Sequence, residues 1–181
     1  MTGFTSYSVE NDKKFAQAID RSLKAVNDLR VPYAQIAKDF YKSRKAIFQL
    51  KSAGQYPDLK ETYKTRKQAA VGFIYPILKL TGALEKSVTG TSDPNNITRI
   101  NPKILEMGTA IEYGVYHQEG RGVPLRKFLF IGPESVKFGN KEIDGFPTRA
   151  LNTLNTYVLR QLGANIQQAT GVKPRINQEK I

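Results

Sequence analysis

Apolar residues at helical spacing constrain the fold of this chain most, and they lie near both of its ends. The stripe near the C-terminus consists of Leu151, Leu154, Val158, Leu162 and Ile166. Steps of three and four residues place such side chains on one face of a helix. Pro147 fits the first turn of this helix, where the N–H that proline lacks has no helical partner. Gly163 weakens the helix by ~1 kcal/mol relative to alanine. The pattern therefore predicts a long C-terminal helix.

The first third of the chain carries two more helical patterns. The first spans residues 10–30, and its apolar side chains are Phe15, Ile19, Leu23, Val26 and Leu29. We expect it to end at Val31-Pro32, because the residue before a proline avoids helical backbone angles. The second spans residues 33–52, and its apolar face consists of Ile36, Phe40, Ile47 and Leu50.

Two further helices are expected before residue 90. Asp58 followed by Glu61 has the form of a capping box, in which the first side chain accepts a bond from a backbone N–H of the opening turn. A third helix should therefore begin after Asp58 and be interrupted near Gly72. Residues 81–87 read as a short helix, with Thr81 as its cap and Leu84 pointing inward.

Turn residues and short runs replace the helical patterns after residue 87. Residues 97–101 alternate weakly, as in a strand, and residues 128–131 form a short apolar run that ends at a Gly-Pro pair. Gly139-Asn140 and Asp144-Gly145 are typical of hairpin or loop turns. We therefore expect an α+β fold with N-terminal helices, a small antiparallel sheet with long loops, and a C-terminal helix.

One domain should span residues 1–170, with residues 1–53 as an N-terminal helical extension. Residues 171–181 are polar and basic and carry no core signal, so we expect them to form an arm. No apolar run approaches the roughly 20 residues that a membrane helix needs. No basic region followed by an apolar stretch opens the sequence, so we also expect no signal peptide.

Positive charge is concentrated in one part of the chain. The net charge is +12, and residues 38–67 hold nine basic and three acidic side chains, which is half of the excess. Such a surplus favours anionic partners, nucleic acid first, although a solvated lysine-rich helix face has the same composition. The side chains that we expect to face DNA or a protein partner are Lys42, Arg44, Lys45, Lys64, Arg66 and Lys67.

Aromatic residues lie close to this basic stretch. They are Tyr33, Tyr41, Phe48, Tyr56 and Tyr63. Aromatic rings interleaved with cations can stack on the bases of single strands. Rings also anchor cores and interfaces, because they bury a large apolar area. We favour the second interpretation for this chain.

Residue types that carry chemistry are scarce. The chain has no cysteine, so it has no disulfide framework and no thiolate. Its only histidine, His117, cannot by itself form a His-rich metal site, and we expect it to be a structural residue that hydrogen-bonds through its ring. The glycines at 120 and 122 belong to neither a P-loop nor a dinucleotide turn. We therefore expect a non-enzymatic protein without a cofactor or metal.

Three stretches of the sequence resemble a known family. The first is Gly54-Gln55-Tyr56-Pro57-Asp58-Leu59, followed by Tyr63 and Lys67. The second is Pro76-Ile77-Leu78, followed by Leu80-Thr81-Gly82-Ala83-Leu84-Glu85-Lys86-Ser87. The third is Gly108-Thr109, Tyr113, Tyr116-His117-Gln118-Glu119-Gly120 and Pro124-Leu125-Arg126-Lys127-Phe128-Leu129. In this order they resemble the phage virion morphogenesis family, the tail-completion proteins of Mu-like phages.

The resemblance implies a structural virion protein that completes the tail or joins it to the head. Its implied partners are other copies in a ring, neighbouring neck, connector or tail proteins, and packaged DNA held without base readout. A hexamer is favoured over a dodecamer, and assembly would take place in the bacterial cytoplasm. The family motif residues that the resemblance implies at interfaces are Thr81, Gly82, Leu84, Ser87, Tyr116, His117, Gln118, Gly120, Pro124, Arg126 and Phe128.

Two of these residues also have a physical interpretation that is independent of the family. In an extended segment Arg126 and Phe128 share a face, so Phe128 should anchor it in the core. Arg126 could pair with a carboxylate, for which Glu112 and Glu119 are candidates, or it could reach a neighbouring subunit. The alternatives to a virion subunit are a free nucleic-acid-binding protein and, with little support from the scattered carboxylates, a nuclease.

Overall fold

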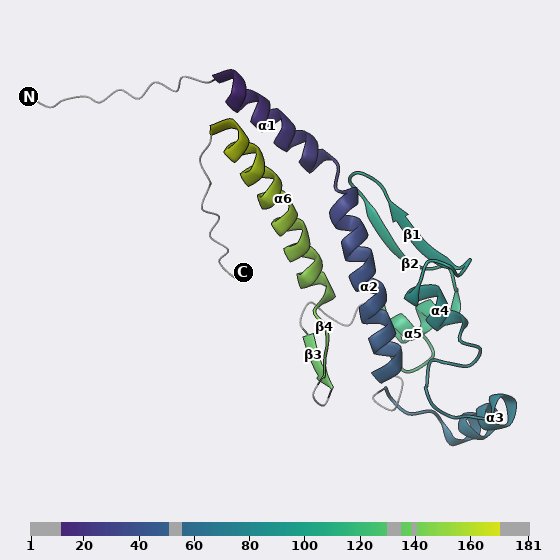
Figure 1. Cartoon of the computed structure of the whole chain (residues 1–181). Helices are drawn as coiled ribbons and strands as arrows, with labels where there is room; N and C mark the ends of the chain where they lie inside the picture. The colour runs from purple at the N-terminus through teal and green to yellow at the C-terminus, as the bar shows by residue number, and fades with distance from the viewer. Residues whose placement is uncertain (1–11, 51–55, 130–134, 139–140, 171–181) are drawn as a thin grey trace, which may run out of the picture.

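The computed structural model describes residues 12–50, 56–129, 135–138 and 141–170, and it has the expected α+β composition (Figure 1). Its helices are α1 (Asp12–Asn27), α2 (Arg30–Leu50), α3 (Glu61–Val71), α4 (Ala83–Thr89), α5 (Tyr113–Glu119) and α6 (Phe146–Thr170). Its strands are β1 (Asn96–Ile100), β2 (Leu105–Thr109), β3 (Ser135–Phe138) and β4 (Lys141–Asp144). Each described helix is too short or too polar to span a lipid bilayer.

Helix α2 contributes buried side chains to both apolar clusters of the fold. Its first half buries Tyr33, Ile36 and Phe40 in a cluster with Phe146 of α6. Its last turns bury Ile47 and Phe48 in a second cluster, which also contains Leu84 and Val88 of α4. The apolar stripe of α2 thus packs into both clusters. Residues 30–50 therefore belong to the core of the fold, although we expected residues 1–53 to form an N-terminal helical extension.

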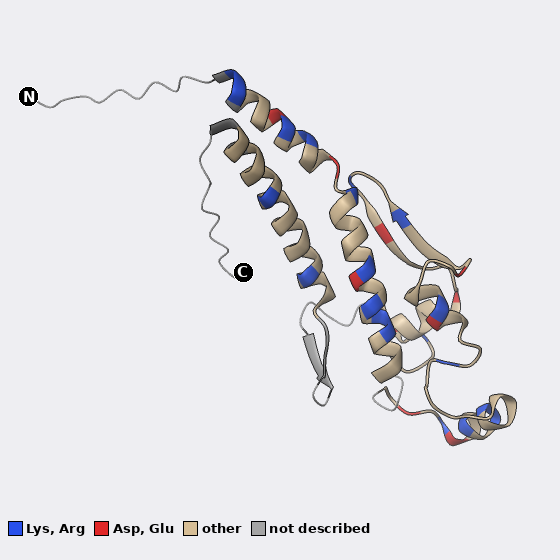
Figure 2. Ribbon diagram, in the orientation of Figure 1, with Lys and Arg blue, Asp and Glu red and all other residues tan. Residues whose placement is uncertain are grey.

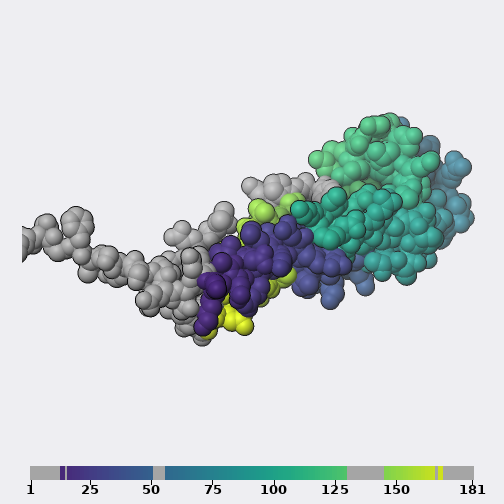
Figure 3. All heavy atoms as spheres, turned by 90° about the horizontal axis from the view of Figure 1, so that it is seen from above, coloured from purple at the N-terminus to yellow at the C-terminus, as the bar shows by residue number. Residues whose placement is uncertain are grey.

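Helices α1 and α6 lie side by side as a stem that projects from the rest of the molecule (Figure 1). The small residues Ala18 and Ser22 are buried in this contact, which lets the two backbones approach. The side-chain amide of Asn165 donates to the Ser22 hydroxyl at 3.1 Å. Seen from above, the stem forms the narrow end of the molecule, and residues of the central part of the chain form the wide end (Figure 3).

The break between the first two helices lies earlier in the chain than predicted. Helix α1 ends at Asn27, and α2 begins at Arg30 rather than at residue 33. Pro32 is therefore inside the first turn of α2, where a missing N–H costs no helical bond. The Asp28 carboxylate accepts a bond from the backbone N–H of Arg30 at 3.2 Å and thereby marks the new start.

Two further helix assignments differ from the sequence. Helix α3 begins at Glu61 with Lys60 at the cap position, because the Asp58 carboxylate bonds the neighbouring Leu59 N–H instead of capping the first turn. The helix ends at Gly72, as predicted, and this glycine has the left-handed φ of 77°. Helix α5 was not predicted at all, because its seven residues are too few to show a helical period.

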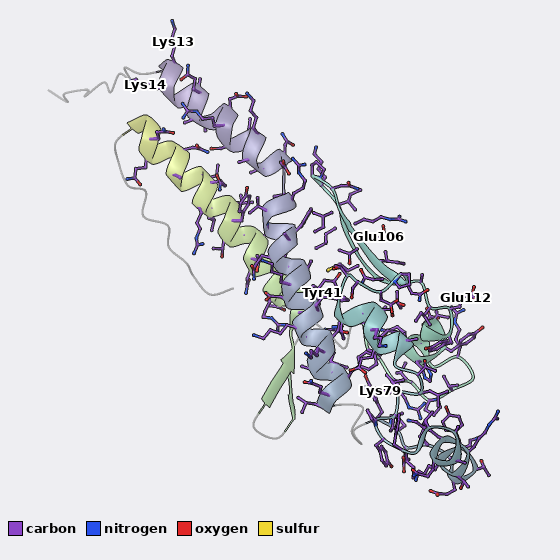
Figure 4. The ribbon with its side chains drawn as sticks, turned by 45° about the vertical axis from the view of Figure 1, so that its right-hand side comes forward. Lys13, Lys14, Tyr41, Lys79, Glu106 and Glu112 are labelled. Carbon is purple, nitrogen blue, oxygen red and sulfur yellow. The ribbon has the colours of Figure 1, made fainter. Side chains whose placement is uncertain are left out.

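The strands form two antiparallel pairs rather than one sheet. In the first, β1 pairs with β2 so that Thr98 lies opposite Met107, which confirms the strand expected near residue 97. Tyr41 of α2 reaches this hairpin through its hydroxyl, which bonds the Thr98 side chain (Figure 4). In the second, β3 pairs with β4 just before α6. The turn predicted at Gly139-Asn140, the predicted last residues 51 and 52 of the second helix and the arm 171–181 lie outside the described residues.

Candidate interaction site

The three stretches that carry the family resemblance come together around one core. Leu84 from the second stretch and Phe128 from the third are 1% and 0% exposed, which confirms that both point inward. Tyr56 from the first stretch belongs to the same cluster, and its hydroxyl donates to the Lys127 carbonyl at 2.6 Å. Segments separated by up to 71 positions are thus locked to one another.

The glutamine of the third stretch fixes backbone. The Gln118 carbonyl oxygen accepts bonds from the N–H groups of Phe128 and Leu129, each at 3.0 Å. The Arg126 N–H also donates to the His117 carbonyl at 2.8 Å. These bonds hold the extended segment against the end of α5, where Gly120 adopts the left-handed φ of 75° and ends the helix. The Gln118 side chain therefore accepts the backbone hydrogen bonds that a neighbouring strand would otherwise accept.

Arg126 holds a loop rather than a carboxylate side chain. The residue is 4% exposed, and its guanidinium donates to the Pro57 carbonyl at 2.8 Å and to the Asp58 carbonyl at 3.3 Å. The predicted pairing with Glu112 or Glu119 is wrong, because Glu119 pairs with Arg121 at 2.5 Å and Glu112 is exposed. The segment 124–128 thus ties the loop before α3 to the core.

The second stretch is likewise structural. The fully buried Ser87 hydroxyl bonds the Leu84 carbonyl and the Thr109 hydroxyl, which joins α4 to β2. Thr81 accepts a weak bond of 3.3 Å from the Ala83 N–H, and Gly82, with φ of 81°, occupies the cap position in place of the predicted Thr81. Tyr116 is an exception, because 49% of it is exposed.

Two of the cations predicted to face DNA or a partner lie in the interior. Arg44 is 0% exposed, donates to the carbonyls of Phe128 and Leu129, and stacks on Phe40 with its guanidinium carbon 5.3 Å from the ring centre. Lys67 is 1% exposed and donates to the carbonyls of Ile74 and Pro76, each at 2.7 Å. The prediction for both residues is wrong, because they lie on the faces of their helices that pack inward.

The remaining four cations differ among themselves. Lys42 and Lys45 are exposed on α2, on the face opposite the buried stripe, and Arg66 is exposed on α3. Basic residues are visible on both helices in Figure 2. Lys64 is paired with both Asp58 and Glu61 at 2.7 Å, so most of its charge is compensated locally. Only Lys42, Lys45 and Arg66 of the predicted set are therefore placed to meet an anionic partner.

A recess opens beside the motif core, between α3, α5 and the segment 122–126. Its volume is about 610 Å³. The apolar walls consist of Leu59, Tyr63, Ile77, Leu78, Leu80, Tyr113, Val123 and Pro124. Thr81, His117 and Arg126 contribute the polar edges from the family motifs. An apolar recess with a few polar groups suits a side chain or a short segment of another protein.

His117 lies in the wall of this recess. Burial, and next the charge of Arg126, lower the pKa of its imidazole below the ordinary value of 6.5, so the ring is neutral at neutral pH. Its Nδ1 atom is buried and has no hydrogen-bond partner among the described residues, so the bond predicted for the ring is not formed at this nitrogen. Among the described residues there is no group of His, Cys, Asp and Glu side chains that could hold a metal ion.

Sequence reasoning identified most of the motif residues but missed the recess and the two buried cations. The spacing contained a signal for Arg44, because it lies four residues after Phe40 and three before Ile47 and so shares their face. No family model, curated protein or solved structure matches the chain. The proposal for its function therefore rests on the three motif stretches, the recess beside them and the exposed cations of α2.

Proposed function

We propose that this chain is a structural virion protein of a tailed bacteriophage, a ring-forming subunit that completes the tail or joins it to the head. It would assemble in the bacterial cytoplasm and then reside at the neck or tail end of the particle. Its partners would be other copies of itself, in a hexamer on the grounds of resemblance, and adjoining neck or tail proteins.

One observation carries this proposal: the polar side chains of the motifs bind backbone and leave an apolar recess at the surface. The chain's own backbone forms hydrogen bonds with the side chains of Gln118, Arg126 and Ser87. Residues used in this way fix the shape of a surface rather than react with a substrate. A rigid surface with an apolar recess is what assembly by burial requires.

The exposed cations support a location beside DNA. Lys38, Lys42 and Lys45 recur at four- and three-residue spacing and form an exposed stripe on α2. Such a stripe attracts phosphates without reading bases. Packaged DNA passing through a ring presents that kind of partner.

Deletion of the gene in the phage that encodes it tests the proposal. We expect DNA-filled heads and tails that remain separate, or tails without a proper end, and restoration of joined particles by the wild-type gene supplied from a plasmid. Infectious particles of normal yield and morphology in the absence of the gene would contradict the proposal.

The lysine stripe also favours a second candidate, a free nucleic-acid-binding protein of a phage. In that case the isolated chain should bind duplex DNA, and log K should fall with log[salt] by about 0.9 for each phosphate that it neutralises. Fluorescence anisotropy at several salt concentrations distinguishes the two candidates, because a ring subunit binds DNA weakly until copies combine their stripes.

A further inference from the structure

Helix α6 is nearly free of charge in a strongly basic chain. Its 25 residues include Arg149 and Arg160 but no acidic side chain and no lysine (Figure 2). In the whole chain, 24% of the residues are charged and the net charge is +12. Identical copies that approach through their basic surfaces repel one another, whereas the α6 surface carries little of this repulsion. Depletion of charge is also typical of the centre of protein interfaces.

One side of α6 carries an apolar ridge, formed by Leu151 and by Val158, which lies seven residues later on the same face. Leu151 is 57% exposed and Val158 is partly buried. The predicted stripe is therefore divided: Leu154 packs on the cluster around Phe40 and Phe146, whereas Leu151 does not enter the core. Burial of this ridge under the apolar surface of another molecule would lower the free energy, because it removes exposed apolar area from water.

A groove runs along the other side of α6, between this helix and the start of α2. Its volume is about 600 Å³, and its wall on α2 includes Val31, which is 68% exposed. Its wall on α2 also contains Asp39, and its wall on α6 is formed by Arg149, Asn152, Thr153, Thr156, Tyr157, Arg160 and Gln161. The groove therefore has an apolar lip and a polar floor.

Helical geometry separates the ridge from the groove. Residues advance by about 100° around a helix, so Arg149, Thr153, Thr156 and Arg160 form one stripe. Leu151 lies two residues from both Arg149 and Thr153, on the opposite side, and Val158 lies seven residues after Leu151, on that same opposite side. A surface and its complement on different sides of one element are what a head-to-tail contact needs.

We propose that the α6 ridge of one copy inserts into the α2–α6 groove of the next copy, so that Leu151 covers Val31 across the contact. This inference rests on the proposed function, in which copies form a closed ring. A contact between two different surfaces leaves a free ridge and a free groove on every partial assembly, and it ends only when the ring closes.

Three matched single substitutions test this contact. Leu151→Arg changes the ridge, Val31→Arg changes the groove, and Ile104→Arg changes an equally exposed apolar residue at the β1–β2 turn, where 61% of the side chain is exposed. Mass photometry should find an oligomer for the wild type and for Ile104→Arg, and monomers for the other two variants. Melting curves should show that all the variants are folded.

Mixing the two monomeric variants is the decisive step. The Val31→Arg chain retains an intact ridge and the Leu151→Arg chain retains an intact groove, so a mixture should give a dimer with one copy of each and no larger species. A mixture that stays monomeric overturns the inference, as does wild-type-like assembly of either variant or a wild type that never assembles.

Cysteine cross-linking gives an independent answer, because the chain has no cysteine of its own. A variant with both Leu151→Cys and Val31→Cys should form a ladder of disulfide-linked copies, whereas Leu151→Cys alone should not. Dimers of Leu151→Cys alone would show a ridge-to-ridge contact and overturn the inference. The proposed function fails separately, if the gene proves dispensable for particle assembly.

Discussion

At the residue scale, three buried cations bind main-chain carbonyls. Arg44, Lys67 and Arg126 each donate to two carbonyl oxygens that lie outside helices and strands. Much of the region between residues 56 and 129 is irregular, so many of its carbonyls lack a partner from regular secondary structure. A buried carbonyl without a hydrogen bond is costly. Cations with several donors satisfy these groups and hold the loops in one arrangement.

Replacement of Arg44 by methionine should lower the free energy of unfolding by about 3 kcal/mol, because it leaves buried carbonyls without a donor. Lys45→Met, at the next and exposed position of the same helix, should change it by less than about 0.5 kcal/mol. Urea denaturation followed by circular dichroism measures both. Equal effects of the two substitutions would show that the bonds from Arg44 to these carbonyls do not stabilise the fold.

Acid should weaken the loop before α3 through Asp58. Bonds from Lys64, Tyr75 and Leu59 lower the pKa of this carboxyl from 3.8 to about 2. The unfolded chain therefore binds more protons between these pH values, and the stabilisation present above about pH 4 is lost as the pH falls to about 2. Melting temperatures across this range should fall less steeply for Asp58→Asn, and an unchanged slope would contradict the assignment.

At the scale of elements, α4, α5 and the segment 124–128 pack too closely for a side chain at Gly114. A Cβ atom at this position would lie 3.2 Å from both Leu84 and Phe128, and these two neighbours are almost fully buried. Neither neighbour can move aside into solvent. Helix α5 is therefore fixed at a distance that only glycine allows.

Gly114→Ala should destabilise the protein by about 1 kcal/mol, since the strain of overpacking exceeds the gain in helix propensity. Gly108→Ala is the matched control, because a Cβ there meets no atom within 4 Å. Thermal unfolding of both variants measures the difference. A stabilised Gly114→Ala variant would mean that α5 can shift away from its neighbours.

Elements with a long apolar repeat, or with a clear cap or turn signal as in α4, could be predicted from the sequence, whereas α5 could not. The long apolar repeats identified α2 and α6, and Pro147 was correctly assigned to the first turn of α6. The seven residues of α5 show no helical period, and the start of α3 depends on which N–H the Asp58 carboxylate bonds. The recess joins segments that are distant in sequence, so no local pattern could reveal it.

At the scale of the whole molecule, charge and apolar surface are separated. The exposed lysine stripe lies on α2, whereas the ridge and groove that we assign to the contact between copies involve α6. Lys13 and Lys14 lie at the far end of the stem from the wide end of the molecule (Figure 4). In the ring that we propose, each copy would meet its neighbours through α6 and present the cations of α2 to DNA.

Reversal of two charges on the stripe should impair particle joining without unfolding the chain. We expect Lys42→Glu combined with Lys45→Glu to lower the infectious titre by roughly tenfold, the scale of two lost ion pairs of about 0.7 kcal/mol each. Lys13→Glu combined with Lys14→Glu, a pair that is equally exposed, should have a much smaller effect. Both titres are measured by complementation of the gene deletion. Equal titres would show that the lysine stripe on α2 is not needed for particle joining.

Electron cryomicroscopy of intact particles tests the central claim most directly. We predict a closed ring of density at the neck or tail end into which copies of this fold can be placed, with α6 of each copy against the α2–α6 groove of the next. A particle in which other proteins account for all of this density, and in which peptides of this chain are not detected, would contradict a structural role in the virion.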